Sequence, residues 1–205
     1  MKAVQEKNRI IATLLAFAVI PMSGLATDIY LPSMPYMAKY FGQAENSIQL
    51  TLSLYLGSYA IAQFFVGSIL DAFGRYKLST ISLFLFMVSF WITAISTDIY
   101  MIYAMRVVQG ILSAFAIVAK RAFFVDVYEG EERRQYLSLM TIVWSAGPIV
   151  APFIGGYLQE HFGWQSNFYL LAVYSGVVGV LEFLFSGETI RKKTAFNAGN
   201  LLRNF

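Results

Sequence analysis

Six long apolar stretches occupy most of the 205-residue chain, at residues 10–31, 49–70, 78–97, 99–119, 136–159 and 164–186. A helix needs about 20 such residues to cross the hydrocarbon core of a bilayer. Lipid offers backbone groups no hydrogen-bonding partner, so each stretch must be helical. The pattern predicts an all-α integral membrane protein, a bundle of six transmembrane helices.

The connections between the stretches are short and carry residues that end helices or form turns. Pro32 and Pro35 follow the first span, and Gly74, Gly130 and Gly163 follow the second, fourth and fifth. We expect the helices to end at these positions.

The first 26 residues also fit a secretory signal. Lys2, Lys7 and Arg9 precede the first apolar run, and small residues occur within positions 23–26. Five further spans follow directly, and an uncleaved first span makes the total even. We therefore favour a spanning helix.

Composition narrows the possible functions. Hydrophobic residues make up 58% of the chain and charged residues 13%, against about 25% charged residues in soluble domains. Cysteine is absent and His161 is the only histidine, which leaves little scope for disulfides, thiolate metal sites or a catalytic triad. The segment Gly67–Gly74 lacks the strand-to-helix context of a nucleotide site. An enzyme is the least favoured class, and we expect no metal or cofactor.

The basic residues lie on one side of the predicted membrane. Thirteen fall in the two tails and in the second and fourth connections: Lys2, Lys7, Arg9, Arg75, Lys77, Lys120, Arg121, Arg133, Arg134, Arg191, Lys192, Lys193 and Arg203. The opposite connections hold Lys39 alone. Cytoplasmic loops carry the excess of Lys and Arg, so we expect both termini in the cytoplasm and the protein in the inner (plasma) membrane.

Two ionisable residues fall within spans, where they are functional candidates by default. Arg106 lies eight residues after Asp98, about 12 Å into the fourth span, and Asp28 lies near the outer end of the first. The alternatives are a structural cross-link for Arg106 and a solvated helix end for Asp28. Residues three, four and seven positions after Arg106 extend a polar face that we expect to line a cavity: Gln109, Gly110 and Ser113. Gln63 and Glu182 are weaker candidates, and the alternative for Glu182 is a side chain that reaches the cytoplasmic surface.

The fifth span carries small residues at four-residue spacing, Gly147, Ala151 and Gly155, with Pro148 and Pro152 between them. This spacing lets another helix approach closely. The prolines each remove a backbone donor. We expect a close helix pair here, whether or not the two helices move.

Four patches follow a common pattern. The second connection reads Gly67-Ser-Ile-Leu-Asp71-Ala72-Phe-Gly74-Arg75, and the fourth span contains Arg106-Val-Val-Gln109-Gly110. The fifth span contains Gly147, Pro148, Ala151, Pro152, Gly155 and Gly156, and the first ends Asp28-Ile-Tyr30-Leu31-Pro32. In this order they resemble the major facilitator superfamily, and within it the drug/proton antiporters of the bicyclomycin-resistance type. Ala72 and Ala151 depart from the usual Arg and Gly.

The resemblance implies one half of a twelve-span transporter, built from two inverted three-helix repeats. Residues 1–186 would form the N-terminal half and residues 187–205 a cytoplasmic linker toward an absent second half. The implied partners are that second half, the lipid bilayer and a small-molecule substrate, with no nucleic acid. Proton-driven efflux of lipophilic drugs is the implied function.

In this scheme Asp28 accepts a proton, and Arg106 favours its ionised form while burial opposes it. The expected substrate cavity includes aromatic and amide side chains: Tyr30, Tyr55, Tyr59, Gln63, Gln109 and Trp144. The second connection, with Gly67, Asp71, Gly74 and Arg75, would act as a conformational latch. Two alternatives remain open: a proton-coupled importer of a small metabolite, and a non-transporting six-span subunit that ends at Phe205.

Overall fold

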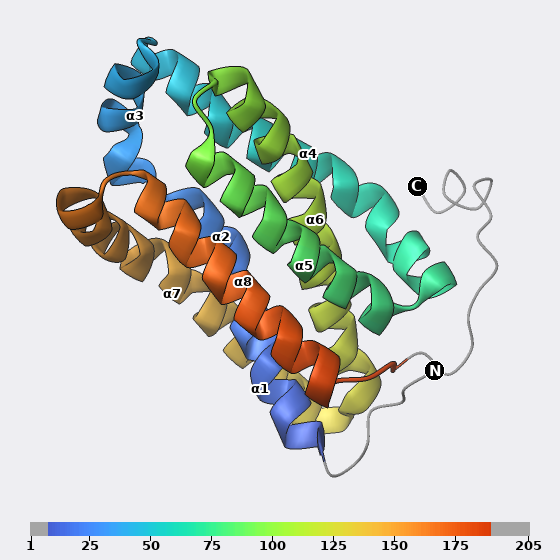
Figure 1. Ribbon diagram of the computed structural model, residues 1–205. Helices are drawn as coiled ribbons and strands as arrows, with labels where there is room; N and C mark the ends of the chain where they lie inside the picture. The colour runs from blue at the N-terminus through green and yellow to red at the C-terminus, as the bar shows by residue number, and fades with distance from the viewer. Residues whose placement is uncertain (1–7, 190–205) are drawn as a thin grey trace.

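The computed structural model describes residues 8–189, which form a bundle of long helices (Figure 1). The first span consists of four short pieces: α1 (Arg9–Val19), α2 (Met22–Asp28), the 3₁₀ helix η2 (Leu31–Ser33) and α3 (Met34–Phe41). Five continuous helices follow: α4 (Glu45–Phe73), α5 (Arg75–Ile95), α6 (Ile99–Val127), α7 (Gly130–Phe162) and α8 (Gln165–Phe185). Among the described residues, six helical segments are long and apolar enough to cross a membrane, which confirms the prediction of six spans.

The first span is longer than predicted, and the expectation that Pro32 and Pro35 end it is wrong. Pro32 and Pro35 lie in the first turns of η2 and α3, where a helix does not need the backbone donor that proline lacks. The span ends instead at Gly42, whose φ of 61° lies in the left-handed region that glycine adopts readily. The expected breaks at Gly74, Gly130 and Gly163 are confirmed.

The fourth span also extends beyond its apolar run. It continues to Val127. Lys120 and Arg121 therefore lie inside α6, whereas their sequence context suggests a loop. A helix persists wherever its backbone hydrogen bonds are satisfied, and hydropathy marks only the part that suits lipid.

The helices pack in a pattern that matches two inverted repeats of three spans. The fourth span (α6) packs against the second (α4), and the fifth span (α7) packs against the first (α2 and η2). Spans one, two and three correspond to spans four, five and six, so exchanging the repeats converts one of these pairs into the other. The third and sixth spans (α5 and α8) pack against each other, as helices on the symmetry axis should.

Small residues bring α7 close to the first span. Gly147, Ala151 and Gly155 are the buried residues of α7. A Cβ atom on Gly155 would overlap the backbone carbonyl of Ile29, and one on Gly147 would lie 3.6 Å from the carbonyl oxygen of Pro21. The predicted close helix pair is therefore confirmed, and its partner is the first span.

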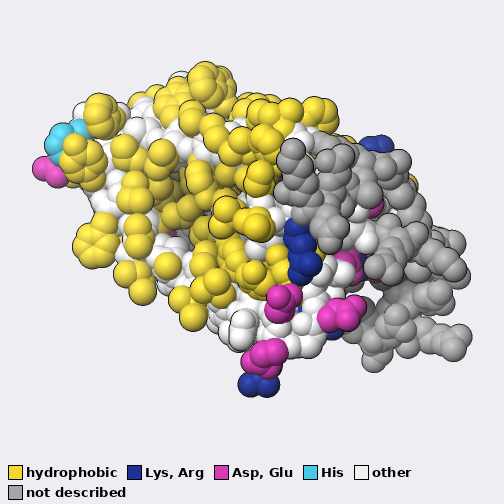
Figure 2. Space-filling view, turned by 90° about the horizontal axis from the view of Figure 1, so that it is seen from below, with side chains coloured by type: hydrophobic (Ala, Val, Ile, Leu, Met, Phe, Trp, Pro, Cys, Tyr) yellow, Lys and Arg dark blue, Asp and Glu magenta, His cyan; other side chains and the backbone are white. Residues whose placement is uncertain are grey.

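Most of the charged side chains visible in Figure 2 gather at one end of the bundle, and hydrophobic side chains cover the middle; an acidic side chain and the histidine lie at the other end. An ion pair between Arg9 and Glu132 (3.3 Å) joins the start of α1 to the start of α7. Another, between Arg75 and Asp126 (2.5 Å), joins the start of α5 to the end of α6. These pairs place the α4–α5 and α6–α7 turns at the same end as the start of α1. The basic residues of the two tails, apart from Arg9, lie outside the described residues, as does most of the expected linker at 187–205.

The close approach at Gly155 makes a prediction about stability. Gly155→Ala should lower the free energy of unfolding by about 1–3 kcal/mol, because the added methyl group meets a backbone carbonyl that cannot rotate away. Thermal unfolding of the purified protein in detergent measures the loss. Gly67→Ala is the matched control, since nothing lies within 4 Å of a Cβ atom there. Equal stability of the two variants would contradict the close packing of α7 on the first span.

Candidate functional site

Arg106 lies at the centre of the bundle with its side chain fully buried. Its Nη1 donates hydrogen bonds to the carbonyl oxygen of Ala26 (3.0 Å), in the last turn of α2, and to Oε1 of Gln109 (3.1 Å). The last carbonyl groups of a helix lack partners within the helix. Arg106 therefore joins α6 to the point where the first span is interrupted.

Three aromatic rings surround the guanidinium group of Arg106. Its central carbon lies 4.1 Å from the ring centre of Tyr30, 5.1 Å from that of Phe168 and 5.9 Å from that of Tyr55. A cation over an aromatic face is stabilised most when water is excluded. Within residues 8–189, Arg106 forms no ion pair with a carboxylate, and its Nε and Nη2 atoms have no hydrogen-bond partner. Phe168 gave no signal in the sequence, because nothing marks a phenylalanine as the neighbour of a distant charge.

The polar face that follows Arg106 does not line a cavity, contrary to expectation. Gln109 is fully buried and donates to Oγ1 of Thr93 on α5 (3.0 Å). A Cβ atom on Gly110 would overlap the backbone of Tyr55 and the hydroxyl of Ser58 on α4. α6 is packed between α4 and α5, so its polar and small residues are used for contacts between helices.

Asp28, at the end of α2, lies in a groove of about 260 Å³ between α2, α4 and α7. We call this the central groove; its lining residues are Ser23, Gly24, Thr27, Asp28, Leu52, Tyr55, Leu56, Tyr59, Trp144 and Pro148. The indole Nε1 of Trp144 donates to Oγ of Ser23 (3.2 Å), which fixes the ring against α2. The groove thus combines one partly buried carboxyl group with aromatic and aliphatic walls.

The groove includes only some of the residues that the sequence assigned to a substrate cavity. Tyr55, Tyr59 and Trp144 line it. Tyr30 instead is fully buried beside Arg106, and its hydroxyl shares a hydrogen bond with that of Thr51 (2.9 Å). Gln109 is buried between helices, and Gln63 is exposed on α4 outside the groove.

Asp28 and Arg106 act on different sides of the first span. Arg106 contacts the backbone of Ala26 and the ring of Tyr30, whereas Asp28 lines the central groove. Successive residues of a helix point in directions about 100° apart. Asp28, two positions from both Ala26 and Tyr30, therefore points away from them. An influence of Arg106 on the ionisation of Asp28 remains a prediction.

The charged corner at the α4–α5 turn is built around Arg75. Its Nε and Nη2 atoms donate to Oδ1 of Asp71 at 2.9 and 2.7 Å, and its Nη1 donates to Oδ2 of Asp126 at 2.5 Å. The backbone N–H of Arg75 donates to Oε1 of Glu188 (3.2 Å), just beyond α8. Sequence reasoning did not assign Asp126 or Glu188 to this corner, because both are distant from it along the chain.

Comparison with known proteins places the chain in a family. The profile of the Major Facilitator Superfamily matches residues 16–202. The chain belongs to the Major Facilitator Superfamily.

Relatives within the superfamily include transporters of several bacteria. The chain is 32% identical to the uncharacterized MFS-type transporter YdgK of Bacillus subtilis, over 90% of this chain and 46% of YdgK. It is 28% identical to a bicyclomycin resistance protein homolog of Haemophilus influenzae, over 92% and 48%. It is 30% identical to the multidrug resistance protein MdtL of a Shewanella species, over 93% and 48%. The chain thus spans about half the length of these curated relatives.

A solved structure shares the fold. The human organic anion transporter MFSD10 (TETRAN) superposes with a TM-score of 0.70 and 18% sequence identity, over 94% of this chain and 51% of that chain. This multi-pass membrane protein therefore has six spans, arranged as in one half of that transporter.

One buried ion pair lies outside the four superfamily patches. Nζ of Lys120 on α6 donates to Oε1 of Glu182 on α8, and both side chains are buried, with 5% and 0% of their surface exposed. The alternative in which Glu182 reaches the surface is wrong. The long side chains of Lys120 and Glu182 bridge the two helices, so the carboxylate is paired with an ammonium group inside the bundle.

This pair predicts a non-additive effect of mutation. Lys120→Met should lower the free energy of unfolding by about 3–5 kcal/mol, because it leaves a buried carboxylate without its partner. The double variant Lys120→Met with Glu182→Leu should recover most of that loss, since no charge remains to be desolvated. Chemical unfolding of the two single variants, Lys120→Met and Glu182→Leu, and of the double variant in detergent measures the coupling. Additive losses would show that the pair does not form.

Proposed function

We propose that the protein is the N-terminal half of a proton-coupled antiporter that exports lipophilic small molecules. The observation that carries the proposal is the partly buried carboxyl group of Asp28 in a groove with aromatic and aliphatic walls. A carboxyl group binds or releases a proton according to the polarity and the charges of its surroundings. It can therefore bind a proton and release it as its surroundings change.

Coupling follows from competition within the central groove. When Asp28 is protonated, it carries no charge that water must solvate, so the apolar walls of the groove can close on each other. The proton thus favours a closed groove, whereas a bound solute favours an open one. The parallel rings of Tyr55 and Tyr59, with centres 6.4 Å apart, and the indole of Trp144 provide flat surfaces for a lipophilic solute.

A second six-span half would complete the site. The helices beside the groove, α4 and α7, expose large apolar side chains, among them Leu56 at 48%, Phe64 at 58% and Phe153 at 78% of their surface. The chain spans 46–48% of its curated relatives. A partner of similar size, seated against α4 and α7, would form the other wall of the groove.

The charges suggest how the protein sits in the membrane and what holds its resting state. The end that carries Arg75, Arg121 and Arg133 would face the cytoplasm of the inner (plasma) membrane, following the positive-inside rule. At that end the Arg75 corner ties α4 and α5 to α6 and to the segment after α8. The corner binds the segment after α8, which would lead toward a second half, so it suits a latch between the halves.

Replacement of Asp28 tests the coupling. Asp28→Asn should reduce proton-driven efflux by roughly a hundredfold or more, because the amide cannot bind the transported proton. The assay uses proteoliposomes with the complete transporter, an imposed pH gradient, and three fluorescent dyes that are cationic, neutral and anionic. Asp98→Asn is the matched control: Asp98 is exposed, and its oxygen accepts from the N–H of Tyr100 to cap α6. Undiminished efflux by Asp28→Asn would rule out the assignment.

A further inference from the structure

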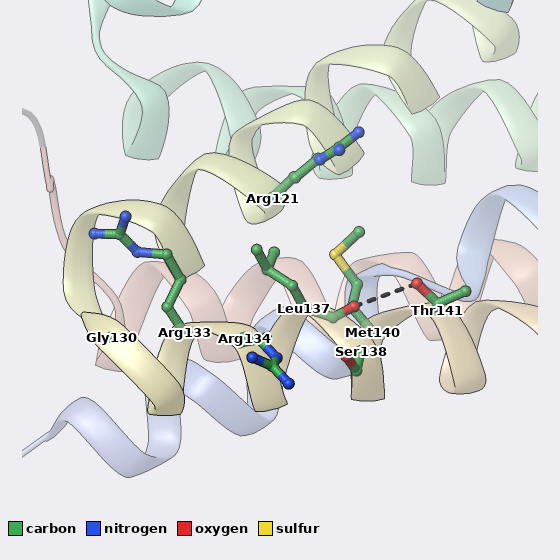
Figure 3. Close-up of a pocket in the computed structure, with 8 residues that line it drawn as sticks. All are labelled: Arg121, Gly130, Arg133, Arg134, Leu137, Ser138, Met140 and Thr141. Atoms are coloured by element: carbon green, nitrogen blue, oxygen red, sulfur yellow. Dashed lines mark hydrogen bonds between the residues drawn. The ribbon is translucent and has the colours of Figure 1, made fainter.

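A second hollow opens between α6 and α7 at the charged end of the bundle (Figure 3). It has a volume of about 490 Å³. We call it the basic pocket; its lining residues are Arg121, Gly130, Arg133, Arg134, Leu137, Ser138, Met140 and Thr141. Arg121 comes from α6 and the other residues from α7. In Figure 3 the side chains of Leu137 and Met140 point toward Arg121, so the pocket has an apolar floor beneath its charged rim.

Of the three acidic residues next to the basic pocket, Glu129 is exposed and the other two are paired. Glu131 lies 3.7 Å from Arg134, and Glu132 lies 3.3 Å from Arg9. Arg121 forms no hydrogen bond or ion pair with any other residue in the described range. Arg133 uses only its Nε, which donates to the carbonyl oxygen of Tyr128 (2.7 Å). Two guanidinium groups of the described chain therefore border the pocket without a carboxylate partner.

The basic pocket continues the central groove. Leu137 and Thr141 line the pocket, and Trp144 and Pro148 line the groove. Their spacing of three and four residues places all four on one face of α7. From Thr141 to Trp144 the helix rises only about 4.5 Å, and from Arg133 to Pro148 about 22 Å. The two hollows thus form successive parts of one path along α7.

The charges along this path are polarised. The arginines lie at one end, aromatic and aliphatic side chains follow, and the carboxyl group of Asp28 lies further along. The planar guanidinium fork suits carboxylate, sulfonate and phosphate groups, to which it donates parallel hydrogen bonds. An ionised Asp28 would repel the same groups.

We propose that the transported solutes are amphipathic organic anions that enter from the cytoplasm with their acidic group on Arg121, at a rim that Arg133 also borders. The apolar part of the solute then lies along α7 toward Trp144. This inference rests on the proposed transport function and names its substrate class. It narrows the expectation of a lipophilic solute to an anionic one, because the arginines at the charged end of the path select against a cation.

Binding of a matched series of probes tests the substrate class. The purified protein in nanodiscs of phosphatidylcholine is titrated with pyrenebutyrate, its neutral amide and a pyrenebutyl trimethylammonium cation, and pyrene fluorescence reports binding. The three probes share one apolar body and differ in charge. We expect the anion to bind at least fivefold more tightly than the amide, and the cation to bind most weakly. Equal or tighter binding of the cation, or no binding of the anion, would overturn the proposal.

Variants locate the site. Arg121→Gln should weaken binding of pyrenebutyrate about tenfold, the effect of losing one charge-assisted contact, and leave binding of the amide unchanged. Arg121→Lys should recover part of the loss, because the charge remains without the fork. Lys77→Gln is the control, since it removes one exposed positive charge from α5, outside the pocket. An equal loss in Lys77→Gln would mean that overall charge, and not this pocket, attracts the anion.

Two further measurements distinguish a transported solute from a bound lipid. Phosphatidylglycerol that displaces pyrenebutyrate at a few molecules per protein, combined with no efflux of the anionic dye, would identify a lipid headgroup site and overturn the proposal. Asp28→Asn should bind pyrenebutyrate in nanodiscs at least as tightly, because the carboxylate that repels the anion is removed, while losing proton-driven efflux. Failure of all three dyes in the efflux assay would therefore count against the transport function, whereas a preference for cations would count only against the substrate class.

Discussion

Burial of the positive charge of Arg106 is the constraint on which the rest of the structure depends. An arginine side chain cannot readily lose its proton, and in a membrane-spanning bundle it must find acceptors or aromatic faces within the protein. It finds both where the first span is interrupted, at the carbonyl of Ala26 and the ring of Tyr30. The interruption supplies an acceptor that a regular helix keeps for itself, so the break in one helix and the charge in another stabilise each other.

The position of the groove follows from how closely α7 approaches that same interrupted span. Gly147, Ala151 and Gly155 let the two backbones touch, and this contact leaves Trp144 beside α2 and facing α4. Asp28 is then held in a wall whose shape is fixed by backbone contacts and not by flexible side chains. A groove of this kind lies along a surface that α4 and α7 leave open to a partner. The same α7 face carries the path down to the arginines at the charged end.

Electrostatics at the charged end divide into neutralised and free groups. Arg75 is saturated by Asp71 and Asp126 and holds helices together, and Lys120 is neutralised by Glu182 inside the bundle. Arg121 has no such partner among the described residues. The positive-inside pattern therefore serves two purposes in one molecule: some of its charges are part of the structure, and others remain available to a ligand. The sequence alone does not distinguish the two, because every basic residue contributes equally to the count.

The sequence determined the number of spans, the helix ends at Gly74, Gly130 and Gly163, and the need for a close helix partner at Gly147 and Gly155. These features depend on local chemistry: hydropathy over about 20 residues, backbone freedom at glycine, and the absence of side-chain bulk. Only the tertiary structure decided that Tyr30 and Gln109 pack beside Arg106 away from the groove, that Glu182 meets Lys120, and that the basic pocket and the central groove are hollows in their present places beside α7. Each of these depends on which helices become neighbours and on their rotation about their own axes. Those two quantities are set by packing over the whole bundle, and no single stretch of sequence contains them.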